Sequence, residues 1–188
     1  MTTFILHGGY TSTPNENNRK YYSKIAELIP KKGKILLIYF AQDEEKWDSL
    51  LENDKENFKK FGNKINFECE VASKDPKELE KQIKNSDCIY IRGGEDYSSI
   101  ELVRKVKNLK KLISGKIIVG SSMGAYIISS YFYNDTHNNI MKGLNLVPVK
   151  TLCHYKESDK EALNKLKRYG ENLPLYALKD TEFVVISQ

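Results

Sequence analysis

The sequence has little cysteine, and its cysteines are not arranged in pairs. Cys69, Cys88 and Cys153 are odd in number and widely spaced, and they form no Cys-x-x-Cys motif. Neither a disulfide framework nor a zinc site of the usual cysteine spacing is therefore indicated. Because disulfides mark oxidising compartments, we expect this chain to work in the reducing cytoplasm.

Long apolar runs are also missing. The first run, Thr3–Leu6, is too short for the core of a signal peptide, and no stretch approaches the roughly 20 apolar residues of a membrane-spanning helix. The net charge is only +5, and the lysines alternate with Asp and Glu instead of forming a basic stripe. We therefore expect a soluble protein that binds neither membranes nor nucleic acid.

Patterns that bind metals or cofactors are absent from the sequence as well. The chain has 3 histidines, which are scattered. No His-x-x-x-His pair and no nucleotide-binding glycine loop accompanies them. We therefore expect neither a metal nor a cofactor.

What the chain does have is a regular alternation of segments. At 188 residues and 40% hydrophobic content, it fits one domain, residues 1–188, with a sizeable core. Short β-type runs alternate with longer amphipathic runs, which predicts a three-layer α/β/α sandwich around a mostly parallel central sheet. The predicted strands are Thr3–His7, Lys34–Phe40, Asn66–Val71, Cys88–Arg92, Lys116–Ser121, Leu144–Val149, Leu175–Leu178 and Glu182–Ile186. The predicted helices are Asn18–Ile29, Glu44–Phe61, Pro76–Lys84, Ser98–Leu112 and a buried one from Ala125 to Phe132.

Glycine and polar residues follow four of the predicted strands. In open α/β sheets, ligands bind beyond the carboxyl ends of the strands. Four such ends at one edge predict a crevice. The segments concerned are His7-Gly8-Gly9, Ala41-Gln42-Asp43, Gly93-Gly94-Glu95 and Ser121-Ser122.

The segment Gly120–Gly124 carries the most specific motif. It follows an apolar β-type run and precedes a helix-type run, and it reads Gly-x-Ser-x-Gly with Ser122 at the centre. In this context the pattern is typical of a nucleophile elbow, because glycines on either side let neighbouring segments approach a serine on a sharp turn. Ser122 in this position could equally be a helix N-cap, so a catalytic reading also needs a base.

Two backbone amides are candidates for an oxyanion hole. Met123 follows Ser122 at the start of the predicted helix, where its N–H is not used by the helix itself. Gly94 lies in a Gly-Gly turn after a predicted strand, where an N–H can face a ligand without a Cβ in the way. We expect these two amides to be the donors.

The base must be a histidine that reaches the serine hydroxyl. His154 is the leading candidate, because it ends an apolar stretch and begins a polar loop. His7 ends the first strand at the same sheet edge and is the rival, whereas His137 is interpreted as a solvated loop residue. The acids that could orient the base are Asp135 and Asp180, which compete, followed by Asp159 and Glu182.

Taken together, these landmarks resemble peptidase family S51, the family of dipeptidase E (alpha-aspartyl dipeptidase), which is related to cyanophycinase. Its members have the class I glutamine amidotransferase-like fold and use serine where the amidotransferases use cysteine. The resemblance extends over nearly the whole chain. The segments that carry it are Leu6–Gly9, Ile91–Glu95, Gly120–Ala125, Gly143–Pro148 and Cys153-His154-Tyr155.

The resemblance implies a role for each candidate residue. Ser122 would be the nucleophile and His154 the base. Asp135, in an Asn-Asp pair after the elbow, would be the acid, with Asp180 as the second candidate. The implied activity is a Ser-His-Asp/Glu hydrolase of small peptides, among them peptides with N-terminal aspartate, acting as a monomer or homodimer without a cofactor.

Three departures from the family pattern concern the substrate. Glu95 replaces an asparagine, and Met123 replaces a small alanine beside the nucleophile. An arginine-rich segment after the histidine is replaced by the lysine-rich segment 156–168, and a lysine lacks the planar fork with which arginine holds a carboxylate. Two other functions therefore stay open: hydrolysis of another small amide or ester, and a small-molecule-binding module without catalysis.

Overall fold

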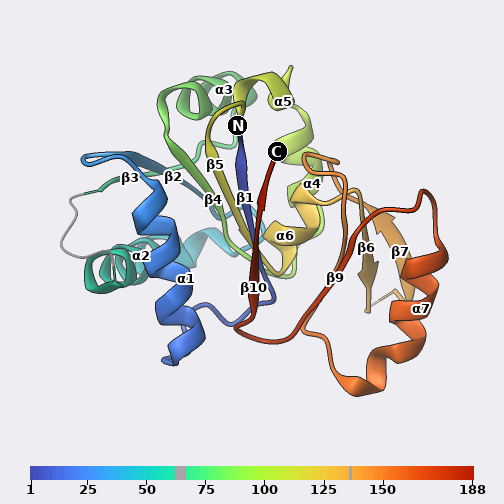
Figure 1. Cartoon of the computed structure of the whole chain (residues 1–188). Helices are drawn as coiled ribbons and strands as arrows, with labels where there is room; N and C mark the ends of the chain where they lie inside the picture. The colour runs from blue at the N-terminus through green and yellow to red at the C-terminus, as the bar shows by residue number, and fades with distance from the viewer. Residues whose placement is uncertain (62–66, 136) are drawn as a thin grey trace.

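The computed structural model describes residues 1–61, 67–135 and 137–188 (Figure 1). Its centre is a six-stranded sheet with the strand order β10-β1-β5-β4-β2-β3. All neighbours in this sheet are parallel except β10, which runs antiparallel to β1. The expected α/β fold with a mostly parallel central sheet is confirmed. The strands are β1 Thr3–His7, β2 Lys34–Ile38, β3 Glu68–Val71, β4 Cys88–Ile91, β5 Ile117–Ser121 and β10 Phe183–Ser187.

Helices cover both faces of this sheet because its strands are apolar on both sides. In β2, Ile35 and Leu37 pack into one core cluster, while Leu36 and Ile38 pack into the other. Successive side chains of a strand point to opposite faces, so an uninterrupted apolar run needs a helical layer on each. The first layer holds α1 Glu16–Leu28, the short 3-10 helix η1 Glu44–Lys46 and α2 Trp47–Phe61. The second holds α3 Pro76–Asn85, α4 Ser99–Arg104, α5 Leu109–Leu112 and α6 Met123–Ile128.

A second sheet, which the sequence did not predict, lies beyond α6 (Figure 1). It has four strands in the order β7-β6-β8-β9. The ring of Phe132 in β6 stacks on that of Tyr126 in α6 at 4.4 Å between centroids, which joins this sheet to the main core. Its elements are β6 Tyr131–Asn134, β7 Asn139–Lys142, β8 Lys150–Cys153, the 3-10 helix η2 Glu157–Asp159, α7 Lys160–Arg168 and β9 Leu175–Leu178.

The predicted helix from Ala125 to Phe132 is wrong in its second half. Helix α6 ends at Ile128, and the chain then turns into β6. The hydroxyl of Ser129 donates to the carbonyl of Ala125 at 2.8 Å, which closes the last turn. The aromatic residues that follow favour a strand.

The predicted strand Leu144–Val149 is also wrong. The amides of Leu144 and Leu146 donate to the carbonyls of Ile127 and Ile128 at 2.8 and 2.9 Å. The last carbonyls of a helix have no partners within it, and this apolar segment supplies them. The strand forms only afterwards, as β8.

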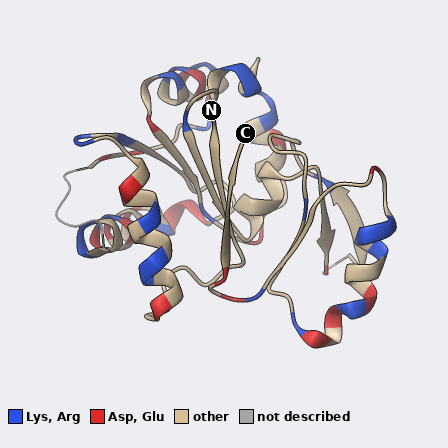
Figure 2. Cartoon of the chain, in the orientation of Figure 1, with Lys and Arg blue, Asp and Glu red and all other residues tan. Residues whose placement is uncertain are grey.

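The predicted helix Ser98–Leu112 is divided into α4 and α5, with Asn108 between them at φ 53°. Asparagine tolerates this left-handed conformation, which a continuous helix does not allow. The predicted start of β3 at Asn66 lies outside the described residues. No described helix is long and apolar enough to cross a bilayer. Along the outer helices α1, α2 and α7, positions of Lys and Arg are interspersed with positions of Asp and Glu (Figure 2).

Candidate active site

Ser122 lies on the sharp turn between β5 and α6. Its backbone has φ 51° and ψ −115°, which residues with a side chain rarely adopt. The Ser122 amide donates to the carbonyl of His7 at 2.9 Å, which helps to hold the turn. A Cβ on Gly120 would lie 2.4 Å from the carbonyl carbon of Gly124, and one on Gly124 would lie 2.0 Å from the carbonyl oxygen of Ile91. Both glycines are therefore required by the close packing of strand and helix around the serine.

His154 follows β8 and directs its ring at this serine. Its Nε2 lies 2.8 Å from Ser122 Oγ, and its Nδ1 lies 2.7 Å from Asp180 Oδ1. Because Nδ1 faces a carboxylate, it carries the proton in the neutral ring, and Nε2 is left to accept from the serine hydroxyl. Hydroxyl, imidazole and carboxylate thus form one continuous hydrogen-bonded chain.

A glycine after β1 makes room for this imidazole. Gly9 has φ +124°, and a Cβ there would lie 2.1 Å from His154 Cε1. The His154 amide donates to the carbonyl of Gly8 at 3.1 Å, and the Thr181 amide donates to that of Gly9 at 3.0 Å. The turn after β1 is therefore bonded to the segments that carry His154 and Asp180. The Gly-Gly pair after a buried strand could be recognised in the sequence, but its position next to the imidazole of His154 could not.

Asp135, the other leading acid, lies elsewhere. It is exposed in the turn between β6 and β7, and it lines a cavity of about 480 Å³ to which His154 also contributes. Partial desolvation, together with the negative charge of Asp159, raises the pKa of Asp135. The structure brings together Ser122, His154 and Asp180, and it hydrogen-bonds the imidazole to Asp180 rather than to Asp135.

The remaining candidates have other tasks. Asp159 accepts from the amide of Lys156 at 2.7 Å, and Glu182 accepts from the amide of Lys179 at 2.9 Å. His137 is exposed in the β6–β7 turn, in agreement with its interpretation as a solvated residue. These three side chains take no part in the hydrogen-bonded chain around Ser122.

His7, the rival base, is fully buried. Its Nδ1 accepts from the Gly9 amide at 3.0 Å, so its Nε2 donates to Asn18 Oδ1 at 2.9 Å. The Asn18 amide group in turn donates to the carbonyls of Tyr10 and Thr13 at 2.8 and 2.7 Å. Burial lowers the pKa of His7 to about 4. Both ring nitrogens are thus committed to holding the loop after β1, and His7 does not contact the serine hydroxyl.

Of the two expected oxyanion donors, Met123 directly follows the serine and Gly94 lines the same cleft as the serine. Met123 is the first residue of α6, so its N–H has no acceptor within the helix. The Gly93 amide donates to Ser121 Oγ at 3.2 Å, whereas none of the described residues accepts from the amide of Gly94. A Cβ on Gly94 would lie 1.9 Å from the carbonyl oxygen of Ala41, so only glycine fits there. The second donor position is therefore available to a ligand.

Ser122 and His154 line a cleft of about 640 Å³ at the carboxyl ends of β1, β4 and β5. This is the sheet edge where the sequence predicts a crevice, and the volume suits a small ligand. Gln42, from the turn after β2, closes one side by donating to the carbonyl of Gly93. Arg92 and Glu95 contribute charged groups to the lining.

The cysteines do not add a second nucleophile. Cys153 is buried, with its Sγ 3.8 Å from the carbonyl oxygen of Ser122, and burial raises the pKa of this thiol. Within residues 1–61, 67–135 and 137–188, no three His, Cys, Asp or Glu side chains gather as a metal site would require.

The chain matches the model of peptidase family S51 over residues 4–188. It is also similar to the uncharacterized peptidase Lmo0363 of Listeria monocytogenes serovar 1/2a, with 26% identity over 134 residues. That match covers 63% of this chain and 65% of the Listeria protein, which is less than two thirds of its length.

Two solved structures resemble this one over nearly the whole chain. A crystal structure of a peptidase from an acI-B1 Actinobacterium has 18% identity and a TM-score of 0.66, and the match covers 98% of this chain and 83% of that one. A putative peptidase E protein from Listeria monocytogenes EGD-e has 21% identity and a TM-score of 0.66, with coverages of 99% and 94%. At these identities the likeness establishes a shared peptidase E-like fold.

Proposed function

This chain belongs to peptidase family S51, and from that membership and its site geometry we propose that it is a serine peptidase acting on small peptides. The observation that carries the proposal is the hydrogen-bonded chain from Ser122 Oγ through His154 to Asp180, at 2.8 and 2.7 Å. A serine hydroxyl is a weak nucleophile unless a base within such a distance accepts its proton.

In the first half of the reaction, Ser122 Oγ attacks the carbonyl carbon of the scissile peptide bond, and its proton passes to His154 Nε2. Asp180 keeps the proton on Nδ1 and stabilises the imidazolium. The amides of Met123 and Gly94 donate to the oxyanion. His154 then gives its proton to the leaving amine, the C–N bond breaks, and an acyl ester remains on Ser122.

In the second half, water attacks the acyl ester and His154 Nε2 takes a proton from it. The same two amides receive the second oxyanion. When this intermediate collapses, the proton returns to Ser122 Oγ and the carboxylic acid product leaves. No redox partner is needed, because the overall change is hydrolysis.

Small peptides are the proposed substrates, and dipeptides with N-terminal aspartate are the first to test. The cleft has a volume of about 640 Å³, which suits a short peptide better than a folded protein substrate. The loop Tyr10–Pro14 and the turn Gly93–Glu95 form its walls.

Intact mass after incubation with a fluorophosphonate tests the activated serine directly. We expect one adduct on the wild-type protein and none on Ser122→Ala or His154→Ala, because labelling needs both nucleophile and base. The matched control is Ser121→Ala, which removes the neighbouring buried hydroxyl and should keep the adduct. A wild-type protein without an adduct at any pH from about 6 to 9 would contradict the proposal.

A further inference from the structure

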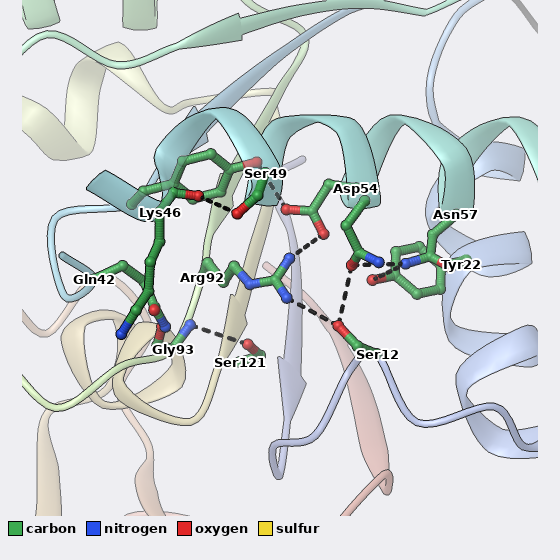
Figure 3. Close-up of polar contacts among 12 residues, drawn as sticks. Ser12, Tyr22, Gln42, Lys46, Ser49, Asp54, Asn57, Arg92, Gly93 and Ser121 are labelled. Carbon is green, nitrogen blue, oxygen red and sulfur yellow. Dashed lines mark hydrogen bonds and ion pairs between the residues drawn. The ribbon is translucent and has the colours of Figure 1, made fainter. Parts of the chain in front are cut away.

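One arginine reaches the cleft from inside the molecule. Arg92 follows β4, and its side chain is only 11% exposed, yet it lines the same cleft as Ser122. Its Nη1 donates to the carboxylate of Asp54, and its Nη2 donates to Ser12 Oγ at 2.9 Å (Figure 3). The guanidinium is therefore held between helix α2 and the loop after β1.

The carboxylate partner occupies an unusual place in α2. Asp54 is 0% exposed and lies on the helix face that carries Leu51 and Phe58. Its other oxygen accepts from the hydroxyl of Tyr39 at 2.8 Å. Apolar residues of similar volume commonly stabilise a fold as well as a buried ion pair does. What the pair adds here is a guanidinium fixed in one orientation, so that little side-chain freedom is lost when a ligand binds it.

This guanidinium has more donors than the protein uses. It carries five N–H groups, and the bonds to Asp54 and Ser12 occupy one on each terminal nitrogen. None of the described residues accepts from the others. Apart from His154, the charged groups among the described residues lining the cleft are Arg92 and Glu95, and Glu95 is exposed to solvent. Arg92 is thus the cation that a bound anion would meet.

The chemistry of the ligand follows from the shape of the donor. A planar guanidinium offers pairs of parallel N–H groups that match the two oxygens of a carboxylate. Because Asp54 already balances the charge of Arg92, directed hydrogen bonds rather than long-range attraction would hold the ligand, and they favour selectivity. The lysine-rich segment does not serve this cleft: its Lys156 and Lys165 line the other cavity, with Asp135.

We propose that Arg92 binds a carboxylate group of the peptide substrate while Ser122 attacks the peptide bond. This inference rests on the proposed peptidase function and adds a specificity-determining residue to it. The carboxylate comes either from the side chain of an acidic N-terminal residue or from the C-terminus of a dipeptide, since the two present the same chemistry to the guanidinium.

Binding measured without turnover separates this inference from the peptidase proposal. In the Ser122→Ala background, calorimetric titrations use four probes: Asp-Leu, Asp-Leu-amide, Ala-Leu and Ala-Leu-amide. Loss of the recognised carboxylate should weaken binding about 10-fold or more, the usual effect of losing a charge-assisted bidentate contact. Weakening on replacing Asp by Ala identifies the side chain, and weakening on amidation identifies the C-terminus.

Two further variants in that background assign the effect to Arg92. Removing Arg92 alone would leave Asp54 buried without a partner, so the pair is replaced together as Asp54→Asn with Arg92→Gln. This double variant should bind the carboxylate probe and its neutral counterpart alike. Asp54→Asn alone is the matched control, because it keeps the guanidinium and an Oδ1 that can accept from it, and it should retain discrimination that the double variant lacks. If the double variant does not fold, Arg92→Lys gives the same test, because an ammonium lacks the fork and should reduce the discrimination.

Each outcome decides one of the two proposals. Equal binding of the four probes, no binding of any of them, or discrimination that persists without the guanidinium overturns the role of Arg92. Carboxylate-dependent binding that requires Arg92, with no hydrolysis of the same peptides by the Ser122 protein, supports the role of Arg92 and overturns the peptidase function instead.

Discussion

Two histidines contact Gly9, but they differ in burial and in hydrogen-bond partners. His7 is 0% exposed, and both of its nitrogens are bonded to neutral groups of Gly9 and Asn18. The His154 side chain is 35% exposed and lies between the hydroxyl of Ser122 and the carboxylate of Asp180. His7 ends β1 of the central sheet and His154 follows β8 of the second sheet, so both lie at the carboxyl end of a strand. It is therefore the partners and the burial, rather than the place at a strand end, that make one of them suited to proton transfer.

The electrostatic consequence is that only one of these rings is suited to carry a positive charge. At His7 an imidazolium would be buried with neutral partners and close to His154, and burial and His154 both lower its pKa. At His154 the carboxylate of Asp180 would offset the charge that forms in the proposed reaction. A neutral His7 therefore supports the floor of the site without adding a competing charge beneath the base.

The largest expected effect comes from removing each ring in turn. His154→Asn should lower kcat about 10⁴–10⁶-fold, because the base is lost while Ser122 remains. His7→Asn leaves the chain from Ser122 to Asp180 intact and should cost far less. Initial rates on the dipeptide substrate, with circular dichroism to verify folding, measure both. Equal losses in two folded variants would remove the distinction between the histidines.

The choice of acid gives the next largest effect. Asp180→Asn preserves shape but no longer stabilises the imidazolium, and it should lower kcat by about 10²–10⁴-fold. Asp135→Asn is the matched control, since its carboxylate lines the other cavity, and it should stay near the wild-type rate. The reverse result would assign the orienting role to Asp135 and would mean that the β6–β7 turn moves towards His154 during catalysis.

The parts of the fold that could be predicted from the sequence are those in which local pattern and tertiary contacts agree. Packing in the core requires the apolar runs of β1, β4 and β5, and the close approach of strand and helix requires the glycines around Ser122. Both features can be read directly from the local sequence, so local pattern and tertiary packing agree there. The segment 144–149 is equally apolar but bonds to the end of α6 instead of to a strand. Its backbone partners are set by the tertiary structure, which periodicity does not reveal.

The geometry of the candidate site was predictable to the same extent. Ser122 could be found from its motif, whereas the preference for Asp180 over Asp135 depends on how the turn after β9 meets β8, far away in the chain. His7 is unsuited to be the base because it is buried and hydrogen-bonded to Asn18. Neither fact can be read from the position of a histidine at the end of a strand. The only hint of Asp54 in the sequence is its helical spacing, which places a carboxylate on the apolar face of α2.

The smallest expected effect is on the free energy of unfolding, and it tests whether His7, unlike His154, is kept neutral by burial. Its pKa is about 4 in the folded protein against 6.5 in the unfolded chain, so the unfolded state binds more protons between these pH values. The contribution of the neutral His7 to the free energy of unfolding is therefore fully present above about pH 6.5. It is lost as the pH falls towards 4, by about 3 kcal/mol in all. Urea unfolding at several pH values should show this loss in the difference between wild type and His7→Asn, because only the wild type carries the ring. A pH-independent difference would mean that the pKa of His7 is the same in the folded and the unfolded protein, and the inference that burial keeps this ring neutral would then be wrong.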